Sequence, residues 1–318
     1  MDHLQHLGNS ISISIQPDED GFTGRECPNP DCEGYFKVEF GTGLEGENLP
    51  CHCPYCGHTA PHDQFWTKEQ VEYTKSVALR RITDAVRKDL KKFEFDHKPK
   101  GMFGIGISLK IKPGSPTPIR YYREKQLETE VVCGNCTLRY SVYGVFAFCP
   151  DCGQHNSVQI LDTNLEVVGK MLDMATTVQG DLADRLIENA LEDCVSSFDG
   201  FGREVCRVYA SKSSYPARAG KISFQNLEGA NRIASAVFSC DLAAGLAGDE
   251  WQTAIRGFQK RHLLAHKMGV IDDEYVRNGH DPHAVVGHKV AVSADEVREI
   301  SRIVGKLALH LSSALEAR

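Results

Sequence analysis

Eight of the twelve cysteines stand at spacings that suit metal binding, and they form two sets of four. Thiolate sulfur is a soft ligand, and a structural zinc ion takes four ligands at tetrahedral corners, with sulfur about 2.3 Å away. Because four protein ligands leave no open position for water, we expect two structural zinc ions and no catalytic one. The predicted ligands are Cys27, Cys32, Cys53 and Cys56 in the first set, and Cys133, Cys136, Cys149 and Cys152 in the second.

The second set has the more regular spacing. Its two Cys-x2-Cys knuckles flank a strand-rich interval and closely resemble those of the zinc-ribbon family. In the first set Cys51 competes with Cys53 as a ligand, because both lie near the second knuckle. The Cys53-x2-Cys56 spacing favours Cys53, and Gly57 directly after it can take the positive φ of a tight turn.

Arg261, His262 and His266 form a second group with chemical potential, in a helix predicted over residues 249–268. Apolar and aromatic residues, among them Trp251 and Phe258, recur on this helix at three- and four-residue steps. A guanidinium and two imidazoles are costly there unless they are solvated, paired or used. Histidine titrates near neutrality and can move a proton, while arginine stays charged and can bind two phosphate oxygens. A charged helix end near solvent is the simpler interpretation.

This stretch resembles the Arg-x4–6-His signature of the HEPN superfamily (higher eukaryotes and prokaryotes nucleotide-binding), with Arg261, a polar residue directly after it, and His266. The aromatic helix before the motif, the Gly269 to Asp272 exit and a closing helix add to the resemblance, which covers about residues 165–318. It implies an all-α domain that works as a homodimer and acts as a metal-independent endoribonuclease. It also suggests a role as a toxin or in phage defence.

Cleavage of RNA through its own 2′-hydroxyl requires a base, positive charge at the phosphate and an acid for the leaving oxygen. The resemblance assigns the proton transfer to His266 and phosphate binding to Arg261, and His262 could orient either one. Arg261 and His266 are five residues apart, which places them about 140° apart around a regular helix. Either a frayed helix end or a second subunit is therefore needed to bring both to one phosphate.

Three other functions remain open. The helical domain could bind a nucleotide, RNA or protein without cleaving anything. Second, His262 and His266 lie on one helical face, as in a zinc hydrolase, but Leu263 stands where an HExxH motif has its glutamate. Third, the chain could be a structural adaptor whose zinc ribbons bind nucleic acid while the helical domain dimerises.

The middle of the chain is the predicted nucleic-acid-binding region. Residues 1–60 contain two Lys/Arg and ten Asp/Glu, whereas residues 80–125 contain thirteen and five. Basic residues near Tyr121 and Tyr122 suit phosphate contacts and base stacking, although an ordinary amphipathic sheet explains their pattern equally well. For the basic half of the preceding helix, a solvated face of a spacer helix is the simpler interpretation. The residues predicted to contact RNA are Arg80, Arg81, Arg87, Lys88, Lys91, Lys92, Lys110, Lys112, Arg120 and Arg123.

Composition limits the remaining possibilities. The chain has 318 residues, is 41% hydrophobic and carries a net charge of −7, which argues against a protein that coats nucleic acid. No apolar run is long enough to cross a bilayer, and the N-terminus lacks the pattern of a signal peptide. Many cysteines without export favour thiolates in a reducing cytoplasm, so we expect a cytoplasmic protein with no membrane partner.

The predicted architecture is α+β and multidomain. Two small zinc-ribbon β modules occupy residues 1–62 and 131–160, and a basic helix with a β-hairpin occupies residues 63–130. We expect the helix to run from a capping box at Thr67 to about Phe95, and the hairpin to span 103–123 with its turn at 113–116. An all-α, HEPN-like bundle follows over 161–318, and its last helix begins at Ser293.

Overall fold

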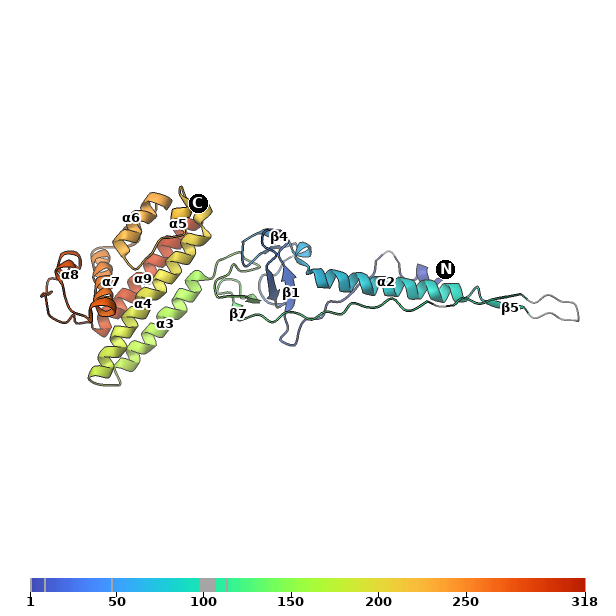
Figure 1. Ribbon diagram of the computed structural model, residues 1–318, viewed down its shortest axis with the longest axis horizontal. Coiled ribbons are helices and arrows are strands. Elements are labelled where there is room, and N and C mark those ends of the chain that lie inside the picture. The colour runs from blue at the N-terminus through green and yellow to red at the C-terminus, as the bar shows by residue number, and fades with distance from the viewer. Residues whose placement is uncertain (1, 9, 47, 98–106, 113, 318) are drawn as a thin grey trace, which may run out of the picture. The chain divides into compact units, whose positions relative to one another are not determined.

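The computed structural model describes residues 2–8, 10–46, 48–97, 107–112 and 114–317. The chain divides into two compact units, Met1–Gln154 (the N-terminal unit) and His155–Arg318 (the C-terminal unit). Figure 1 shows the sheets and the long helix α2 in the first unit and a group of helices in the second. The fold is thus α+β, with small antiparallel sheets and a helical C-terminal part.

A four-stranded antiparallel sheet forms the centre of the N-terminal unit, in the order β1-β2-β8-β7. Its two middle strands come from the two different cysteine-containing segments, with Lys37 opposite Ser141. The regions predicted as separate ribbons therefore share one sheet. The strands are β1 (Thr23–Glu26), β2 (Tyr35–Val38), β7 (Thr129–Val132) and β8 (Arg139–Val142), and a second sheet pairs β3 (Pro50–His52) with β4 (Thr59–Pro61).

Helix α2 (Lys68–Lys91) begins at the predicted capping box, in which the Thr67 side chain accepts from the Gln70 N–H and the Gln70 side chain accepts from the Thr67 N–H. It ends four residues earlier than predicted, and Phe95–His97 (β5) instead pairs with Ile107–Leu109 (β6). Before α2 lie the short helix α1 (Asp2–Gln5) and a 3-10 turn, η1 (His62–Phe65). The carboxylate of Asp89 on α2 accepts from the N–H groups of His3 and Leu4 in α1.

The hairpin predicted over 103–123 is wrong. The paired strands are β5 and β6, and residues 114–123 run as an extended segment with no strand partner. Their backbone groups bond instead to side chains of α2, since Arg80 donates to the Thr117 carbonyl at 2.9 Å and the Arg120 N–H donates to the Ser76 hydroxyl at 3.0 Å. Residues 103–106 and 113 of the predicted hairpin lie outside the described residues. Alternating residues are typical of any extended chain packed on a surface, so the pattern alone could not distinguish the two.

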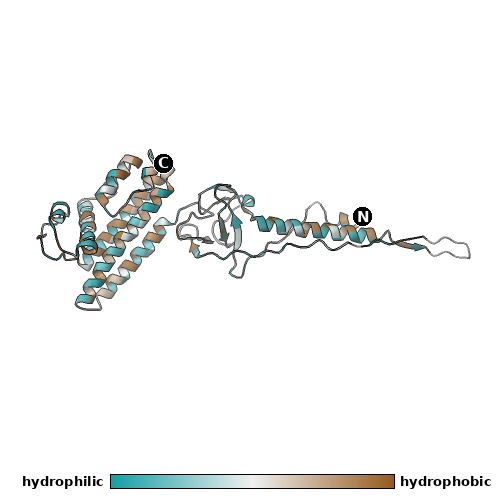
Figure 2. Cartoon of the chain, in the orientation of Figure 1, coloured by the Kyte–Doolittle hydropathy of each residue, from teal (hydrophilic) through white to brown (hydrophobic). Residues whose placement is uncertain are grey.

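The C-terminal unit is built from helices around one apolar core. Figure 1 shows α3, α4 and α9 running side by side, and Figure 2 shows apolar and polar residues alternating around them. Leu172, Phe198 and Leu307 are fully buried between these helices. The elements are α3 (Ser157–Ala175), α4 (Asp181–Val208), η2 (Ala210–Lys212), α5 (Pro216–Ala219), α6 (Leu227–Phe238), η3 (Leu242–Gly245), α7 (Glu250–Lys267), α8 (Asp273–Asn278) and α9 (Ala294–Glu316).

Local signals account for several of these helix ends. The Ser293 hydroxyl accepts from the Glu296 N–H and begins α9 as predicted. The sequence predicts one helix from about Asn226 to Ala247. In the structure it is broken, because Ser239 takes a left-handed conformation (φ 46°) and Asp241 then caps η3. Among the described residues, no helix is both long enough and apolar enough to span a membrane.

Candidate functional site

The two cysteine sets form two clusters whose sulfur atoms converge. In each cluster the four Sγ atoms lie within 4.8 Å of one another. Sulfurs held 2.3 Å from a tetrahedral ion stand about 3.8 Å apart, and the closest pairs match this, with Cys27–Cys56 at 3.7 Å and Cys136–Cys149 at 3.5 Å. These distances are far longer than the roughly 2.05 Å of a disulfide bond. The donor sets therefore fit two metal ions.

Equivalent turns build the second knuckle of each cluster. The Gly57 N–H donates to the Cys53 carbonyl, and the Gly153 N–H donates to the Cys149 carbonyl, each at 2.9 Å. Both glycines have left-handed backbones, with φ of 69° and 70°. Since this conformation favours glycine, the Cys-x2-Cys-Gly pattern specifies the turn that points both sulfurs to one side. Cys51 lies outside the clusters, buried in β3 opposite Ala60, and Cys53 is the residue that joins the first set.

The thiols within each cluster differ in acidity. Burial raises the pKa of Cys27 to about 12 and also raises the pKa of Cys53. Burial acts in the same direction on Cys56, but hydrogen bonds from the His58 N–H and from neighbouring thiols outweigh it and lower the pKa of that group. Metal binding to such a set must displace the remaining protons, so it depends on pH.

The Arg261 side chain lies between α7 and α4, where polar side chains bind it. It extends from α7 to α4, where Nη2 donates to Oε1 of Glu192 at 3.0 Å and to the Ser196 hydroxyl at 3.5 Å. The residue is only 8% exposed, and its Nε has no hydrogen-bond partner among the described residues. Glu192 and Ser196 were not predicted as site residues from the sequence. Their four-residue spacing puts them on one face of α4. The packing of α4 against α7 joins distant parts of the chain, however, so the sequence did not identify them as partners of Arg261.

The two histidines lie against each other beside Arg261. The ring centroids of His262 and His266 are 4.9 Å apart, with the ring planes tilted by 53°. Burial lowers the pKa of His262, and the nearby His266, Lys267 and Arg261 lower it further. His262 is therefore neutral at physiological pH, and a neutral imidazole can accept a proton. His266 is exposed, and Lys267 next to it forms ion pairs with Asp272 and Glu274.

The structure leaves Arg261 and His266 on different sides of α7. This helix is regular through Lys267, so the frayed end that could have brought the two together does not occur. Arg261 is directed to α4, whereas His266 lies on the exposed side. Among the described residues, the groups of three or more potential metal ligands are the two cysteine sets. His262 and His266 belong to neither of them.

Most of the arginines predicted to contact nucleic acid hold the N-terminal unit together. Arg81 donates to the Ser12 carbonyl at 3.0 Å, Arg87 donates to the Ser115 carbonyl, and Arg120 pairs with Glu72 at 2.6 Å. Arg80 also pairs with Asp84, and Lys92 with Asp89. The contacts of Arg81, Arg87 and Arg120 attach the extended segments 10–16 and 114–123 to α2. The alternation of Ile11, Ile13 and Ile15 in the sequence predicts a strand, but residues 10–16 are not part of any strand. The remaining predicted contacts are Lys88, Lys91, Lys110, Lys112 and Arg123.

Comparisons with known proteins give no match: no family model, no curated protein and no solved structure is similar to this chain.

Proposed function

We propose that the protein is a metal-independent endoribonuclease whose chemistry resides in the C-terminal unit, with a structural zinc ion in each cysteine cluster. The observation that carries the proposal is the arrangement at the end of α7. There a permanently charged guanidinium, held by Glu192 and Ser196, lies on the same helix as two imidazoles whose ring centroids are 4.9 Å apart. This is the donor set that 2′-hydroxyl attack requires, in a region whose sequence resembles the HEPN superfamily.

In this mechanism the RNA supplies its own nucleophile. One imidazole removes the proton of the 2′-hydroxyl, whose oxygen attacks the adjacent phosphorus and displaces the 5′-oxygen. A second imidazole, in its protonated form, donates a proton to that leaving oxygen. His262 is suited to the first role because its lowered pKa keeps it neutral, and the exposed His266 is placed for the second. Arg261 stabilises the negative charge on the phosphate. The product strand ends in a 2′,3′-cyclic phosphate.

The proposal includes a homodimer. Within one chain, α7 carries Arg261 and His266 on different sides of a regular helix. A two-fold axis near α7 would bring the same surface of a second chain opposite the first, so that one chain contributes the arginine and its partner the exposed histidine. Light scattering tests this point, since a monomer that cleaves RNA at full rate would contradict it.

Cleavage assays on matched variants test the catalytic assignment. His266→Ala is expected to lose about a hundredfold or more in rate, as for loss of a general acid or base. Arg261→Lys keeps the charge but loses the planar fork, so we expect it to bind RNA yet cleave slowly. The controls are His283→Ala and Arg298→Ala, which change exposed residues outside α7. Equal rates for all variants would remove Arg261 and His266 from the mechanism.

One observation favours a second function, the binding of RNA, a nucleotide or a protein without cleavage. Arg261 is almost fully buried and already paired with a carboxylate, so a phosphate must compete with Glu192 for it. Binding of labelled RNA with no cleavage by the wild-type protein, and with equal affinity in His266→Ala, would favour this alternative.

A further inference from the structure

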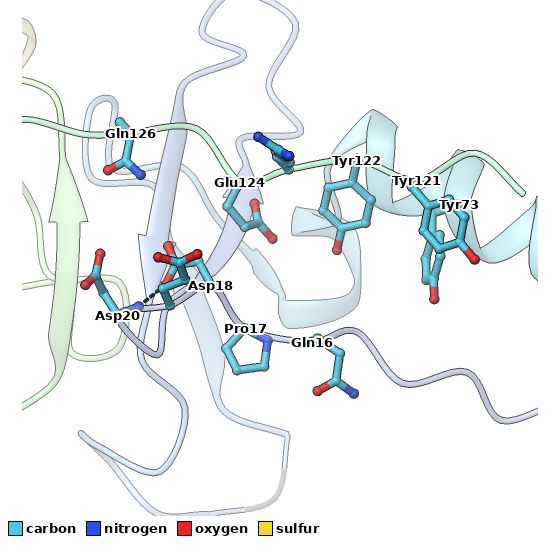
Figure 3. A pocket seen from close by; sticks show the side chains of 11 residues that line it. Gln16, Pro17, Asp18, Asp20, Tyr73, Tyr121, Tyr122, Glu124 and Gln126 are labelled. Carbon is cyan, nitrogen blue, oxygen red and sulfur yellow. Dashed lines mark hydrogen bonds between the residues drawn. The ribbon is translucent and has the colours of Figure 1, made fainter.

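A cavity of about 640 Å³ lies within the N-terminal unit, away from both metal clusters. Its walls come from three parts of the chain: residues 16–20, which end in a turn, Tyr73 of α2, and the segment 121–126. Figure 3 shows tyrosine rings at one end of the cavity and carboxylates at the other. Its volume falls within the roughly 300–1,000 Å³ of ordinary ligand sites.

Three tyrosines form the aromatic end. The ring of Tyr73 lies 6.0 Å from that of Tyr121 and 5.7 Å from that of Tyr122, the latter edge-on. Tyr121 is 78% exposed, so much of its ring is open to a ligand. Burial and the nearby Glu124 raise the pKa of Tyr122 to about 12, which keeps it a neutral phenol. Neutral aromatic rings present an electron-rich face that attracts cations within about 6 Å.

The carboxylates at the other end are held in fixed positions. Asp18 accepts from Nζ of Lys37 at 2.7 Å and from the Phe22 N–H at 2.8 Å. Glu124 accepts from the Tyr35 hydroxyl at 2.5 Å and from the Gln70 amide at 3.1 Å. Such anchoring reduces the cost of ordering these groups when a ligand binds.

The charge of the cavity selects a cation. Lys37 offsets the charge of Asp18, and the buried Arg25 lies close enough to Glu124 to offset part of its charge. At the exposed edge, Glu19 and Asp20 outnumber Arg123, so the wall remains net negative. A nucleic acid stacked on the tyrosines would bring its phosphates against these two carboxylates. A positively charged group instead gains from both the rings and the acids.

We propose that this cavity binds the lysine or arginine side chains of an extended peptide from a partner protein. The long apolar stem of such a side chain can lie on Tyr121 and Tyr122, and its charged end can reach the carboxylates. With a volume of about 640 Å³, the cavity is large enough for more than one side chain. This site is independent of the proposed ribonuclease.

A binding experiment on the full zinc-loaded chain tests the proposal, with fluorescently labelled pentalysine as the probe. The double variant Tyr121→Leu/Tyr122→Leu removes the rings without changing the charge, and we expect its affinity to fall about tenfold. Tyr143→Leu, which alters a half-exposed tyrosine outside the cavity, is expected to bind as the wild type does. Tyr121→Phe keeps the ring and should also bind normally. Pentalysine acetylated on every side chain should not bind.

Three outcomes would overturn the proposal. The first is equal pentalysine binding by the wild type and the double leucine variant, which would mean that only the overall negative charge attracts the peptide. In the second, a single-stranded RNA oligomer binds and loses affinity in the double variant while pentalysine does not, and the cavity is then a base-stacking site. In the third, free spermidine binds and loses affinity in the double variant while pentalysine does not, and the ligand is then a polyamine. Unchanged zinc content and helical signal in the variants exclude misfolding as the cause.

Discussion

The two units of this protein are stabilised in different ways. In the N-terminal unit much of the small core consists of cysteines, which share it with residues such as Phe36 and Phe65. In the C-terminal unit the core is formed by aliphatic and aromatic side chains of long amphipathic helices, and its cysteines Cys194, Cys206 and Cys240 are buried thiols outside any ligand cluster. An antiparallel sheet needs a hydrophobic face or a packed helix for independent stability, and here cysteines make up much of the core behind it. From this comparison we expect metal binding by the cysteine clusters to supply folding free energy in the first unit, as apolar burial does in the second.

Loss of one metal ligand should show the largest difference in stability between the two units. Cys149→Ser removes a ligand from the second cluster, and structural zinc sites contribute about 10 kcal/mol or more to folding. We expect metal analysis to fall from about two zinc ions per chain to about one. Hydrogen exchange should show that residues around β7 and β8 lose protection while α4 and α9 keep theirs.

Cys51→Ala is the matched control, because Cys51 is buried near the first cluster but is not part of it. It should keep both metal ions. If Cys149→Ser kept its zinc, or if the C-terminal helices lost protection with the sheet, the two units would not be stabilised independently.

Acid should weaken the C-terminal unit through His155. Burial lowers the pKa of this histidine from 6.5 to about 4, with Arg207 adding to the effect and Glu204 opposing it. Its Nδ1 accepts from the Ser157 N–H, which requires the neutral ring. The folded state therefore binds fewer protons than the unfolded state. The resulting stability is complete above pH 6.5 and is lost as pH falls towards 4, by about 3 kcal/mol at most.

Urea unfolding followed through Trp251 fluorescence, in a Trp66→Phe background, measures this change. His155→Gln should have a flatter dependence of unfolding free energy on pH between 6.5 and 4 than the wild type, whereas the exposed His283→Gln should not. Identical slopes in all three proteins would mean that His155 is not neutral in the folded chain.

Two neighbouring glycines of α4 allow a finer test of packing in the C-terminal unit. A Cβ on Gly202 would lie 2.5 Å from the ring of Phe224, whereas a Cβ on Gly200 would have open space. Gly202→Ala is therefore expected to destabilise the unit by about 2 kcal/mol through overpacking. Gly200→Ala should stabilise it by about 0.5 kcal/mol, because alanine favours the helix. Thermal unfolding gives both values, and a stabilised Gly202→Ala would show that the core is loosely packed at Phe224.

The metal clusters could be predicted from sequence because their ligands are arranged by short turns. Two cysteines and a following glycine specify the second Cys-x2-Cys knuckle of each set locally, and Gly57 and Gly153 adopt the expected conformation. Likewise, the capping residues Thr67 and Ser293 mark helix starts through contacts with residues three positions away.

Features that depend on distant parts of the chain could not be predicted in this way. The pairing of β2 with β8 joins segments about a hundred residues apart, so the expected boundaries at 62 and 130 fall within one compact unit. The segment 114–123 alternates like a strand, but α2 supplies its hydrogen-bond partners. For the same reason, nothing near Arg261 in sequence identifies Glu192 as its partner.

The most direct test of the central claim compares RNA with DNA of the same sequence under single-turnover conditions, with and without EDTA. The account predicts that RNA alone is cut, that the products end in a cyclic phosphate, and that the rate is unaffected by the chelator as long as the C-terminal unit stays folded. Cleavage of DNA, or loss of RNA cleavage in EDTA while that unit remains folded by circular dichroism, would contradict it.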